Sequence, residues 1–565
     1  MSQIPLRRLL GGLVGVITFA ACQPAVQDAA TTPLTTDELI RESDLGRRIE
    51  TLASDAFMGR APGTEGGRLS AQYIADEMKA AGLVPMGDNG TYFQNVTLTK
   101  SLVSDVSTYA ISNDGSVLVE GVAGENVTFW SKRLDPTITL NDSEMVFVGY
   151  GVVAPEYDWN DYEGLDITGK TVVMLVNDPG FGTQDPELFN GNSMTYYGRW
   201  TYKFEEAGRQ GAAGAIVIHQ TAPASYPWEV VGGAWTGPQN DLVRPDGGAN
   251  RTLIESWVNE ETAVAMFEAA GLDFTEMASR ALSNEFEPVP LDGLTLDVAL
   301  SQQVLSVESP NVAGGIIGTE SPDEFMLYMA HWDHMGQSEG EGDTIYNGAV
   351  DNATGTSAII EIGEAFVEKG APKRSAIFVA VTAEESGLLG SAYYAAKPLV
   401  PLAQTVAGIN IDGVQPLGKT KDMIVVGYGA SELEDRLNTI LMTRDMRIQP
   451  DVNPSAGYFY RSDHISLAKE GVPMLYPGGG IDHVTKGSAY GEAVNKEYTA
   501  ERYHKPGDEY DNSWDLSGIK QIAEILFELG YDLADSDDWP NWYDGNEFRA
   551  LRDEMRSETI DSGAE

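Results

Sequence analysis

Residues 324–334 read EFMLYMAHWDH, an apolar run that ends in a cluster of residue types that bind metals. Short apolar runs of this kind are typical of strands buried on both faces of a sheet. Two further runs, RSAIFVAVTAEE at 374–385 and TVAGINID at 405–412, have the same form, and NATGTSAIIEIGEAFVEKG at 352–370 has helical spacing. This alternation predicts an α/β fold, with a mostly parallel, doubly wound sheet and helices on both faces.

Polar side chains follow each of the three predicted strands at the point where the strand ends. Because ligands of open parallel sheets lie at the carboxyl ends of the strands, we expect these side chains to converge at one edge. An aspartate just before the predicted helix joins them, since the helix dipole favours an ionised carboxylate there. The converging residues are His331, Asp333, Asp351, Glu384, Glu385 and Asp412.

One imidazole among several carboxylates is a donor set that suits zinc, and a paired site needs a second imidazole. His504, in YHKPGDEYD at 503–511, is the best candidate among the six histidines. Glu384 and Glu385 are neighbours on an extended segment, so their side chains point to opposite sides. One of them can bind metal while the other takes a proton from water, which predicts metal-assisted hydrolysis with two zinc ions.

The composition is that of a globular protein long enough for two or three domains, with 565 residues, of which 42% are hydrophobic and 61 are glycines. Lys and Arg number 37 against 85 Asp and Glu, which gives a formal net charge of −48. Such an excess of negative charge argues against nucleic acid or a bare anionic lipid surface as a partner.

The first residues have the pattern of an export signal. Arg7 and Arg8 precede an apolar run at 9–21 that is too short to span a bilayer and ends in FAAC. Cys22, the only cysteine, stands where a bacterial lipoprotein carries its lipid, although Phe19 is unusual where leucine is commoner. We therefore expect a signal peptide at 1–22, a linker at 23–36, export to the periplasm and anchoring through Cys22. By resemblance to known lipoproteins, Gln23 rather than Asp after the cysteine indicates the outer membrane.

Changes in the pattern of helix-forming and strand-forming residues along the chain indicate its domains. Helical patterns begin after residue 36, short β-rich runs broken by Gly, Pro and Asp fill the middle, and the strand–helix alternation follows. We expect a first part of the catalytic domain at 37–130, an inserted β-rich domain at 131–290 and the second part of the catalytic domain at 291–535. An acidic, aromatic tail at 536–565 is expected to pack only in part.

Several motifs together resemble those of a known family. AHWDHMG (330–336), NGAVDNATGTSAIIE (347–361), VTAEESGLLGS (381–391), NIDG (410–413), RSDH (461–464) and YHKPGDEYD (503–511) occur in this order. They resemble the co-catalytic di-zinc exopeptidases, which include bacterial leucyl aminopeptidases and glutamate carboxypeptidase. The inserted region resembles the protease-associated domain that many members carry. The likeness runs from about 37 to 535.

The resemblance implies a role for each matching residue. His331 and Asp412 would hold one zinc ion, Glu385 and His504 the other, and Asp351 would bridge them. Asp333 would orient His331, and Glu384 would be the general base of a metallo-aminopeptidase that hydrolyses N-terminal peptide bonds. The family often has a cis peptide bond after its bridging aspartate, here between Asp351 and Asn352.

One residue departs from the family pattern, and four others are expected to contact substrate. His334 stands where many members have Ser or Ala, and it follows the HxD triplet too closely for us to expect a well-placed metal bond. His464 is expected to line the pocket. Tyr458, Tyr460 and Arg461 lie near the expected loop, which leaves the donor to the reacting oxygen undecided between them.

Other functions remain open. Carboxypeptidase and glutaminyl cyclase chemistry occur on the same fold, and a transferrin-receptor-like binding module would have lost its ligands, none of which is missing here. GQSEG at 336–340 matches the G-x-S-x-G pattern of serine hydrolases, but an acidic, Gly-rich loop follows it where a nucleophile elbow needs a helix. The resemblance to exopeptidases makes peptides the expected substrates.

Overall fold

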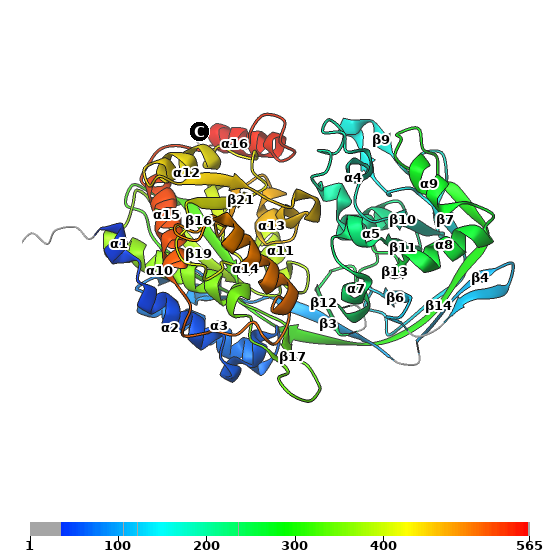
Figure 1. Cartoon of the computed structure of the whole chain (residues 1–565), viewed down its shortest axis with the longest axis horizontal. Coiled ribbons are helices and arrows are strands. Elements are labelled where there is room, and N and C mark those ends of the chain that lie inside the picture. The colour runs from blue at the N-terminus through cyan, green and yellow to red at the C-terminus, as the bar shows by residue number, and fades with distance from the viewer. Residues whose placement is uncertain (1–34, 105–106, 121–122, 235–236, 563–565) are drawn as a thin grey trace, which may run out of the picture.

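The computed structural model describes residues 35–562, apart from the short gaps at 105–106, 121–122 and 235–236. The expected signal peptide and Cys22 lie outside the described residues, as does nearly all of the expected linker. Among the helices that are described, none combines the length and apolarity needed to cross a membrane. Figure 1 shows two bodies side by side, each built around its own sheet.

The first sheet is mixed: its centre is parallel, as predicted from the sequence, and antiparallel strands lie on both sides of that centre. Its central strands β19, β16, β20 and β23 run parallel, while β15 and β21 pair antiparallel on either side. Strand order is β1-β15-β19-β16-β20-β23-β21-β22, with β2 also on β15. The strands are β1 Val84–Pro85, β2 Phe93–Gln94, β15 Asn311–Ile316, β16 Ser321–His331, β19 Arg374–Val381, β20 Thr405–Asn410, β21 Asp422–Val426, β22 Arg447–Pro450 and β23 Met474–Gly478.

Strand β16 shows how the two faces of this sheet are covered. Its side chains alternate between two hydrophobic clusters, as the pleat of a strand requires. Met326 and Tyr328 pack with helices α10 (Thr354–Lys369) and α15 (Ser517–Ala534), whereas Leu327 and Met329 face α11 (Leu389–Ala396) and α13 (His464–Ala468). The prediction of a doubly wound α/β fold is confirmed.

Both ends of the described chain pack onto this first body. At the N-terminus, α1 (Thr36–Leu39), α2 (Glu42–Leu52) and α3 (Glu65–Ala80) lie on the α10 side. The segment after residue 535 is better anchored than expected: Trp542 is fully buried and donates to the Gly471 carbonyl oxygen at 3.1 Å. In α16 (Arg549–Ser562), buried Arg552 donates to the carbonyl oxygens of Thr405 and Val406 at 3.2 and 2.9 Å.

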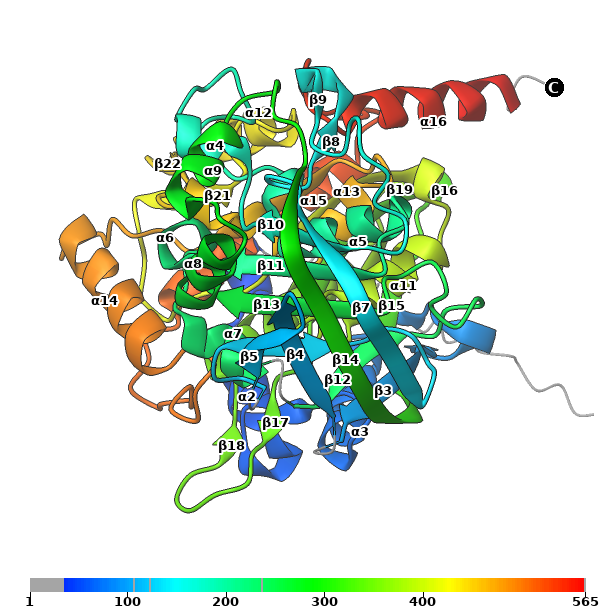
Figure 2. The ribbon, with the colours of Figure 1, turned by 90° about the vertical axis from the view of Figure 1, so that its right-hand side faces the viewer.

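The second sheet has a parallel centre of four strands, β7-β10-β11-β13, with the long β14 antiparallel to β7 on one side and the short β6 antiparallel to β13 on the other. Figure 2 shows the long strands β14 and β7 crossing this body together. Helices α5 (Trp200–Arg209), α8 (Glu260–Ala269) and α9 (Phe274–Arg280) belong to it. Its strands are β3 Thr97–Val103, β4 Thr108–Asn113, β5 Ser116–Glu120, β6 Val127–Trp130, β7 Thr137–Phe147, β10 Thr171–Leu175, β11 Gly214–His219, β12 Gln239–Leu242, β13 Ile254–Asn259 and β14 Val289–Glu308.

The second sheet extends beyond the boundaries expected for the inserted domain at both ends. It takes in β3, β4, β5 and β6 before residue 131, and β14 continues to Glu308, well past residue 290. The local pattern of strand-forming residues could not place these boundaries, because β3 pairs with β14 across some 200 residues of sequence.

Polar contacts join the two bodies, among them Lys469 Nζ to the Tyr196 hydroxyl at 2.6 Å and Asn240 Nδ2 to Ser386 Oγ at 3.0 Å.

Candidate metal centre

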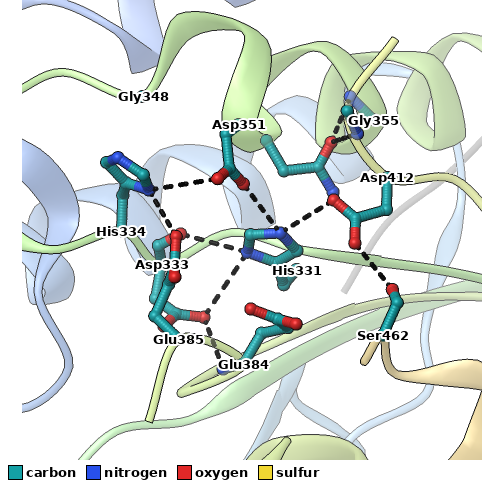
Figure 3. A network of polar contacts seen from close by, with 12 residues as sticks. His331, Asp333, His334, Gly348, Asp351, Gly355, Glu384, Glu385, Asp412 and Ser462 are labelled. Carbon is teal, nitrogen blue, oxygen red and sulfur yellow. Dashed lines mark hydrogen bonds and ion pairs between the residues drawn. The ribbon is translucent and has the colours of Figure 1, made fainter. Parts of the chain in front are cut away.

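The polar residues at the strand ends do meet. His331 is the last residue of β16, Glu384 and Glu385 follow β19, Asp412 follows β20, and Asp351 lies just before α10. Figure 3 shows their side chains directed toward one another from these separate segments. The sheet thus brings residues that are up to 81 positions apart in sequence to one place, at the edge where its parallel strands end.

The first cluster contains one imidazole and two carboxylates. His331 Nε2 lies 3.1 Å from Asp412 Oδ1 and 3.2 Å from Asp351 Oδ1. The other oxygen of Asp412 accepts a hydrogen bond from Ser462 Oγ at 2.6 Å, which fixes the orientation of this carboxylate. A group of one nitrogen and two oxygen donors within 4.8 Å of one another is a suitable metal cradle.

The second cluster shares Asp351 with the first. His504 Nε2 lies 3.2 Å from Asp351 Oδ2 and 3.1 Å from Glu385 Oε2. Asp351 therefore turns one oxygen toward each imidazole, which is the arrangement that a bridging carboxylate needs. The peptide bond between Asp351 and Asn352 is cis, as the resemblance implied.

His334 also belongs to this second cluster, contrary to the expectation from its position in the sequence. Its Nδ1 lies 2.6 Å from Glu385 Oε1 and 4.0 Å from Asp351 Oδ2, and the side chain is fully buried. The expectation rested on how closely His334 follows the HxD triplet. Strand β16 ends at His331, and beyond that end the side chain of His334 returns to the same side.

Residues behind the clusters hold the ligand-bearing loops in place. Asp508 accepts the backbone N–H groups of Val350 and Asp351 at 3.1 Å each. Arg60 is buried and donates to the carbonyl oxygens of Trp332 and Gly348 at 2.8 Å, which ties the two ligand loops together. Neither residue follows a predicted strand, so the sequence pattern did not single them out.

Asp333 has a different contact from the one expected. The nearest partner of His331 Nδ1 is the main-chain oxygen of Asp333 at 3.2 Å, while the carboxylate oxygen Oδ1 is 3.9 Å away. That carboxylate oxygen instead accepts the backbone N–H of Glu384 at 3.0 Å. Burial raises the pKa of Asp333 to about 7. Asp333 thus contacts two parts of the site. Its carboxylate orients the segment that carries Glu384, and its main-chain oxygen lies beside His331.

The electrostatics of the centre favour cations. Burial lowers the pKa of His331, but the negative charges of Asp412 and Glu384 outweigh it and hold that pKa well above its usual range. Burial likewise raises the pKa of Glu385, yet His504 and His334 bring it to about 2. Carboxylates that hold protons on neighbouring imidazoles offer the same stabilisation to a metal dication, which replaces those protons on binding.

Glu384 stands apart from the metal-binding groups. It is half-buried beside the first cluster, and burial raises its pKa well above the usual range, with the charge of Glu385 adding to the effect. A carboxylate with a raised pKa next to a metal site is suited to exchange protons near neutral pH.

The four residues expected to bind substrate differ in where they lie. Arg461 is placed at the boundary of the two bodies, where its guanidinium lies 5.5 Å from the rings of both Tyr226 and Tyr458. The position of Tyr460 does not support its expected role, because it is buried and its hydroxyl donates to Glu547 at 2.9 Å. His464 is fully buried as well, and therefore does not line an open surface.

Two residues near the site were missed by the sequence reasoning. Arg199 lies directly before α5 in the second body, and its buried Nε–H has no hydrogen-bond partner among the described residues. Burial and the neighbouring charge of Arg461 lower its pKa to about 9. Tyr476, on β23, lies close enough to Asp412 and Glu384 for burial and these charges to raise its pKa well above the usual range. Only the packing of the two bodies brings Arg199 here, so no local motif could reveal it.

The competing serine-hydrolase interpretation fails on the local fold. Gly336–Gln337 forms strand β17, which pairs in a hairpin with β18 (Ile345–Tyr346). Ser338 is exposed on the loop that joins them. A nucleophile elbow requires a helix directly after the serine, and here the chain turns back into a strand.

Comparison with known proteins agrees with this geometry. Residues 311–530 match the sequence model of Peptidase family M28. The matched segment is therefore similar to the peptidase domains of that family. It contains the first sheet from β15 onward, together with both clusters and Glu384.

Similar proteins include peptidases of two kinds. Aminopeptidase NAALADL1 of Mus musculus is 34% identical over 126 residues, covering 21% of this chain and 16% of that protein. A glutamate carboxypeptidase 2 homolog of Caenorhabditis briggsae is 23% identical over 367 residues, covering 54% of this chain and 44% of that protein. The chain therefore spans less than half the length of these curated relatives.

Solved structures with a similar chain trace include an aminopeptidase from Aneurinibacillus sp. strain AM-1. The two share 17% sequence identity with a TM-score of 0.48, over 88% of this chain and 95% of that one.

Proposed function

We propose that this protein is a zinc-dependent aminopeptidase that hydrolyses the N-terminal bond of peptides. The observation that carries the proposal is Asp351, whose two oxygens each lie 3.2 Å from a different imidazole, His331 and His504. Asp412 and Glu385 complete the two clusters. This donor set of imidazoles and carboxylates fits two zinc ions.

The residues of the chain would divide the work of hydrolysis. When bound, the zinc ions would supply Lewis acidity toward the peptide carbonyl and lower the pKa of water. Glu384 would take the proton from the attacking water and return it to the nitrogen of the leaving amine, a role that suits its raised pKa. Asp333 would keep Glu384 in position through the hydrogen bond to its backbone N–H.

A comparison of free and N-acetylated aminoacyl-anilides, each with and without a chelator, tests this proposal. An aminopeptidase cleaves only the free substrates, and chelation abolishes the cleavage. Equal cleavage of the acetylated substrates would contradict the aminopeptidase assignment, and activity that survives chelation would contradict metal dependence.

A second function, carboxypeptidase activity, is favoured by one specific observation. Arg199 and Arg461 lie close enough for the charge of one to lower the pKa of the other, and each has a buried Nε–H without a hydrogen-bond partner. No acidic side chain forms an ion pair with either among the described residues. A carboxylate of the substrate would satisfy both guanidinium groups.

Peptides with free and amidated C-termini separate the two functions. A carboxypeptidase loses activity on the amidated peptide, and Arg199→Gln weakens its use of the free acid by raising KM. An aminopeptidase is indifferent to the C-terminal block.

We also propose that the chain is exported and anchored to a membrane by a lipid on Cys22. The support is the pattern of the first residues, with two arginines, an apolar run and the lone cysteine. Metabolic labelling with a radioactive fatty acid, compared between the natural chain and Cys22→Ser, tests this.

A further inference from the structure

His334 is the feature that the proposed function leaves unused. Its imidazole is fully buried, and among the described residues neither Nδ1 nor Nε2 has a hydrogen-bond partner. A buried polar group without a partner costs free energy, so its presence calls for an explanation. Both unpaired nitrogens belong to a ring that lies within the second cluster.

The contact between His334 and Glu385 is not a hydrogen bond. Nδ1 and Oε1 are only 2.6 Å apart, yet both atoms lack a hydrogen-bond partner because the ring N–H direction does not point at the oxygen. The donor atoms of His334, Glu385 and Asp351 all lie within 4.8 Å of one another, so the three side chains could hold one cation.

The ring of His334 is also held in place. Gly348 has a φ of +53°, and a Cβ added there would lie 2.6 Å from the Cγ and Cδ2 atoms of the imidazole. On another side the ring of His504 approaches edge-on, with the ring centroids 5.8 Å apart. The imidazole is therefore confined between Gly348, Glu385 and His504, which preorganises its Nδ1 toward the cluster.

We propose that His334 is a third imidazole ligand, bound through Nδ1 to the metal ion of the second cluster. This inference rests on the proposed function, in that it takes the same pair of metal ions. The second cluster then offers two imidazoles and two carboxylates, and the first offers one imidazole and two carboxylates.

Unequal metal affinity follows from this difference in donors. Imidazole is a better ligand than carboxylate for borderline ions such as zinc and cobalt. The second cluster therefore fills first and keeps its ion longer. In the first cluster, Asp412 also accepts a hydrogen bond from Ser462. This cluster loses its ion at lower chelator concentrations than the second cluster does.

The competing explanation places His334 outside the coordination shell, as a hydrogen-bond donor that orients Glu385. Loss of such an outer partner already weakens metal binding by about 10–100-fold. Affinity alone therefore does not separate the two explanations. The deciding measurement must detect the bond between the imidazole and the metal.

Cobalt substitution provides that measurement on the full-length protein. In the dicobalt form, each imidazole bound directly to cobalt gives a strongly shifted, exchangeable N–H resonance in the proton NMR spectrum. We expect resonances from His331, His504 and His334 in the natural chain. We expect His334→Asn to lack one of them, as His504→Asn does.

His483→Asn is the matched control. His483 is a buried histidine whose Nδ1 accepts the backbone N–H groups of Thr485 and Lys486, and an asparagine oxygen can accept the same bonds. This variant keeps all the shifted resonances. Chelator competition on the same samples is expected to show the tighter site weakened by more than about 100-fold in His334→Asn.

Shifted resonances from His331 and His504 alone in the natural chain would overturn the inference, even where His334→Asn does not fold. So would a His334→Asn spectrum that keeps every resonance. The proposed function is tested separately, because chelator-sensitive hydrolysis with only those two resonances leaves it standing. A protein with all three resonances and no peptidase activity would refute the function and support the role of His334.

Discussion

Single residues at this site are explained by the charges that face them. Asp351 is almost fully buried, and a buried carboxylate is costly unless it is paired. Hydrogen bonds from His331 and His504 outweigh burial and hold its pKa well below the usual range. Glu384 lacks such partners and has a raised pKa instead. The two carboxylates therefore suit different tasks, one as a bridge between cations and one as a proton acceptor.

Replacement of Glu384 by Gln tests this division at the residue scale. The variant is expected to keep its metal content, since Glu384 is outside both clusters, but to lose turnover by about 10²–10⁴-fold because the proton acceptor is gone. Metal analysis and kcat on an aminoacyl-anilide are the measurements. Glu339→Gln, on the exposed loop after β17, is the control and should behave as the natural protein. Near-normal turnover in Glu384→Gln would contradict the assignment of the base.

Much of the site was predictable residue by residue. His331, Asp351, Glu385, Asp412 and His504 lie together, and each was found from its position at a strand end, before a helix or in a family motif. His334 was not expected among them. The turn after β16 returns its side chain to the cluster, and a strand pattern does not describe a turn.

At the scale of elements, close packing between strand and helix positions the site. Tyr328 of β16 donates its hydroxyl proton to the Leu526 carbonyl oxygen of α15 at 2.8 Å. Gly530, one turn later, leaves room for that ring, since a Cβ there would lie 1.7 Å from the Tyr328 hydroxyl oxygen. Strand β16 ends three residues later at His331. The contact between Tyr328 and α15 therefore fixes the position of the strand that carries this candidate ligand.

Gly530→Ala is expected to destabilise the protein, although alanine usually stabilises a helix interior by about 0.5–1 kcal/mol over glycine. Overpacking costs about 1–3 kcal/mol, and displacing the Tyr328 hydroxyl leaves a buried group unpaired. The free energy of unfolding in urea should fall by about 2 kcal/mol. Gly46→Ala in α2 is the control, since the nearest atom to its new Cβ is the flexible end of Leu516. A stabilised Gly530→Ala would refute this account of the packing.

At the scale of the whole molecule, two charge effects dominate. The clusters gather carboxylates where the bodies meet, near Arg199 and Arg461, whose Nε–H groups have no hydrogen-bond partner among the described residues. The chain as a whole carries a formal charge of −48. Like charges repel one another more strongly in the compact state than in the unfolded chain. We therefore expect stability to depend both on cations bound at the site and on ions in the solvent.

Metal removal is expected to lower the thermal unfolding midpoint. A ligand that binds only the folded state stabilises it by about 2.7 kcal/mol at a concentration 100 times its dissociation constant. Differential scanning calorimetry with zinc and with excess chelator measures the shift. Asp351→Asn, which weakens both clusters at once, should show little response to zinc. A midpoint that chelation leaves unchanged in the natural chain would contradict metal binding at this site.

Added salt is expected to raise the same midpoint. The screening length falls to about 10 Å at 0.1 M ionic strength, which weakens repulsion between surface carboxylates. Midpoints measured in about 0.02 M and 0.5 M sodium chloride should therefore rise with salt. Sucrose at matched osmolarity serves as the uncharged control. If sucrose reproduces the whole increase, repulsion between charges is not its cause.

The sequence by itself determined the strand and helix alternation of the first body, the α/β class and the residues at the strand ends, because buried strands, helix periods and strand termini leave local patterns. Only the tertiary structure decided the extent of the second sheet, the return of His334 to the second cluster and the placement of Arg199 beside Arg461. Those features depend on pairing between strands about 200 residues apart and on contacts between the two bodies. Such contacts are set by the packing of whole surfaces, and no short stretch of sequence encodes them.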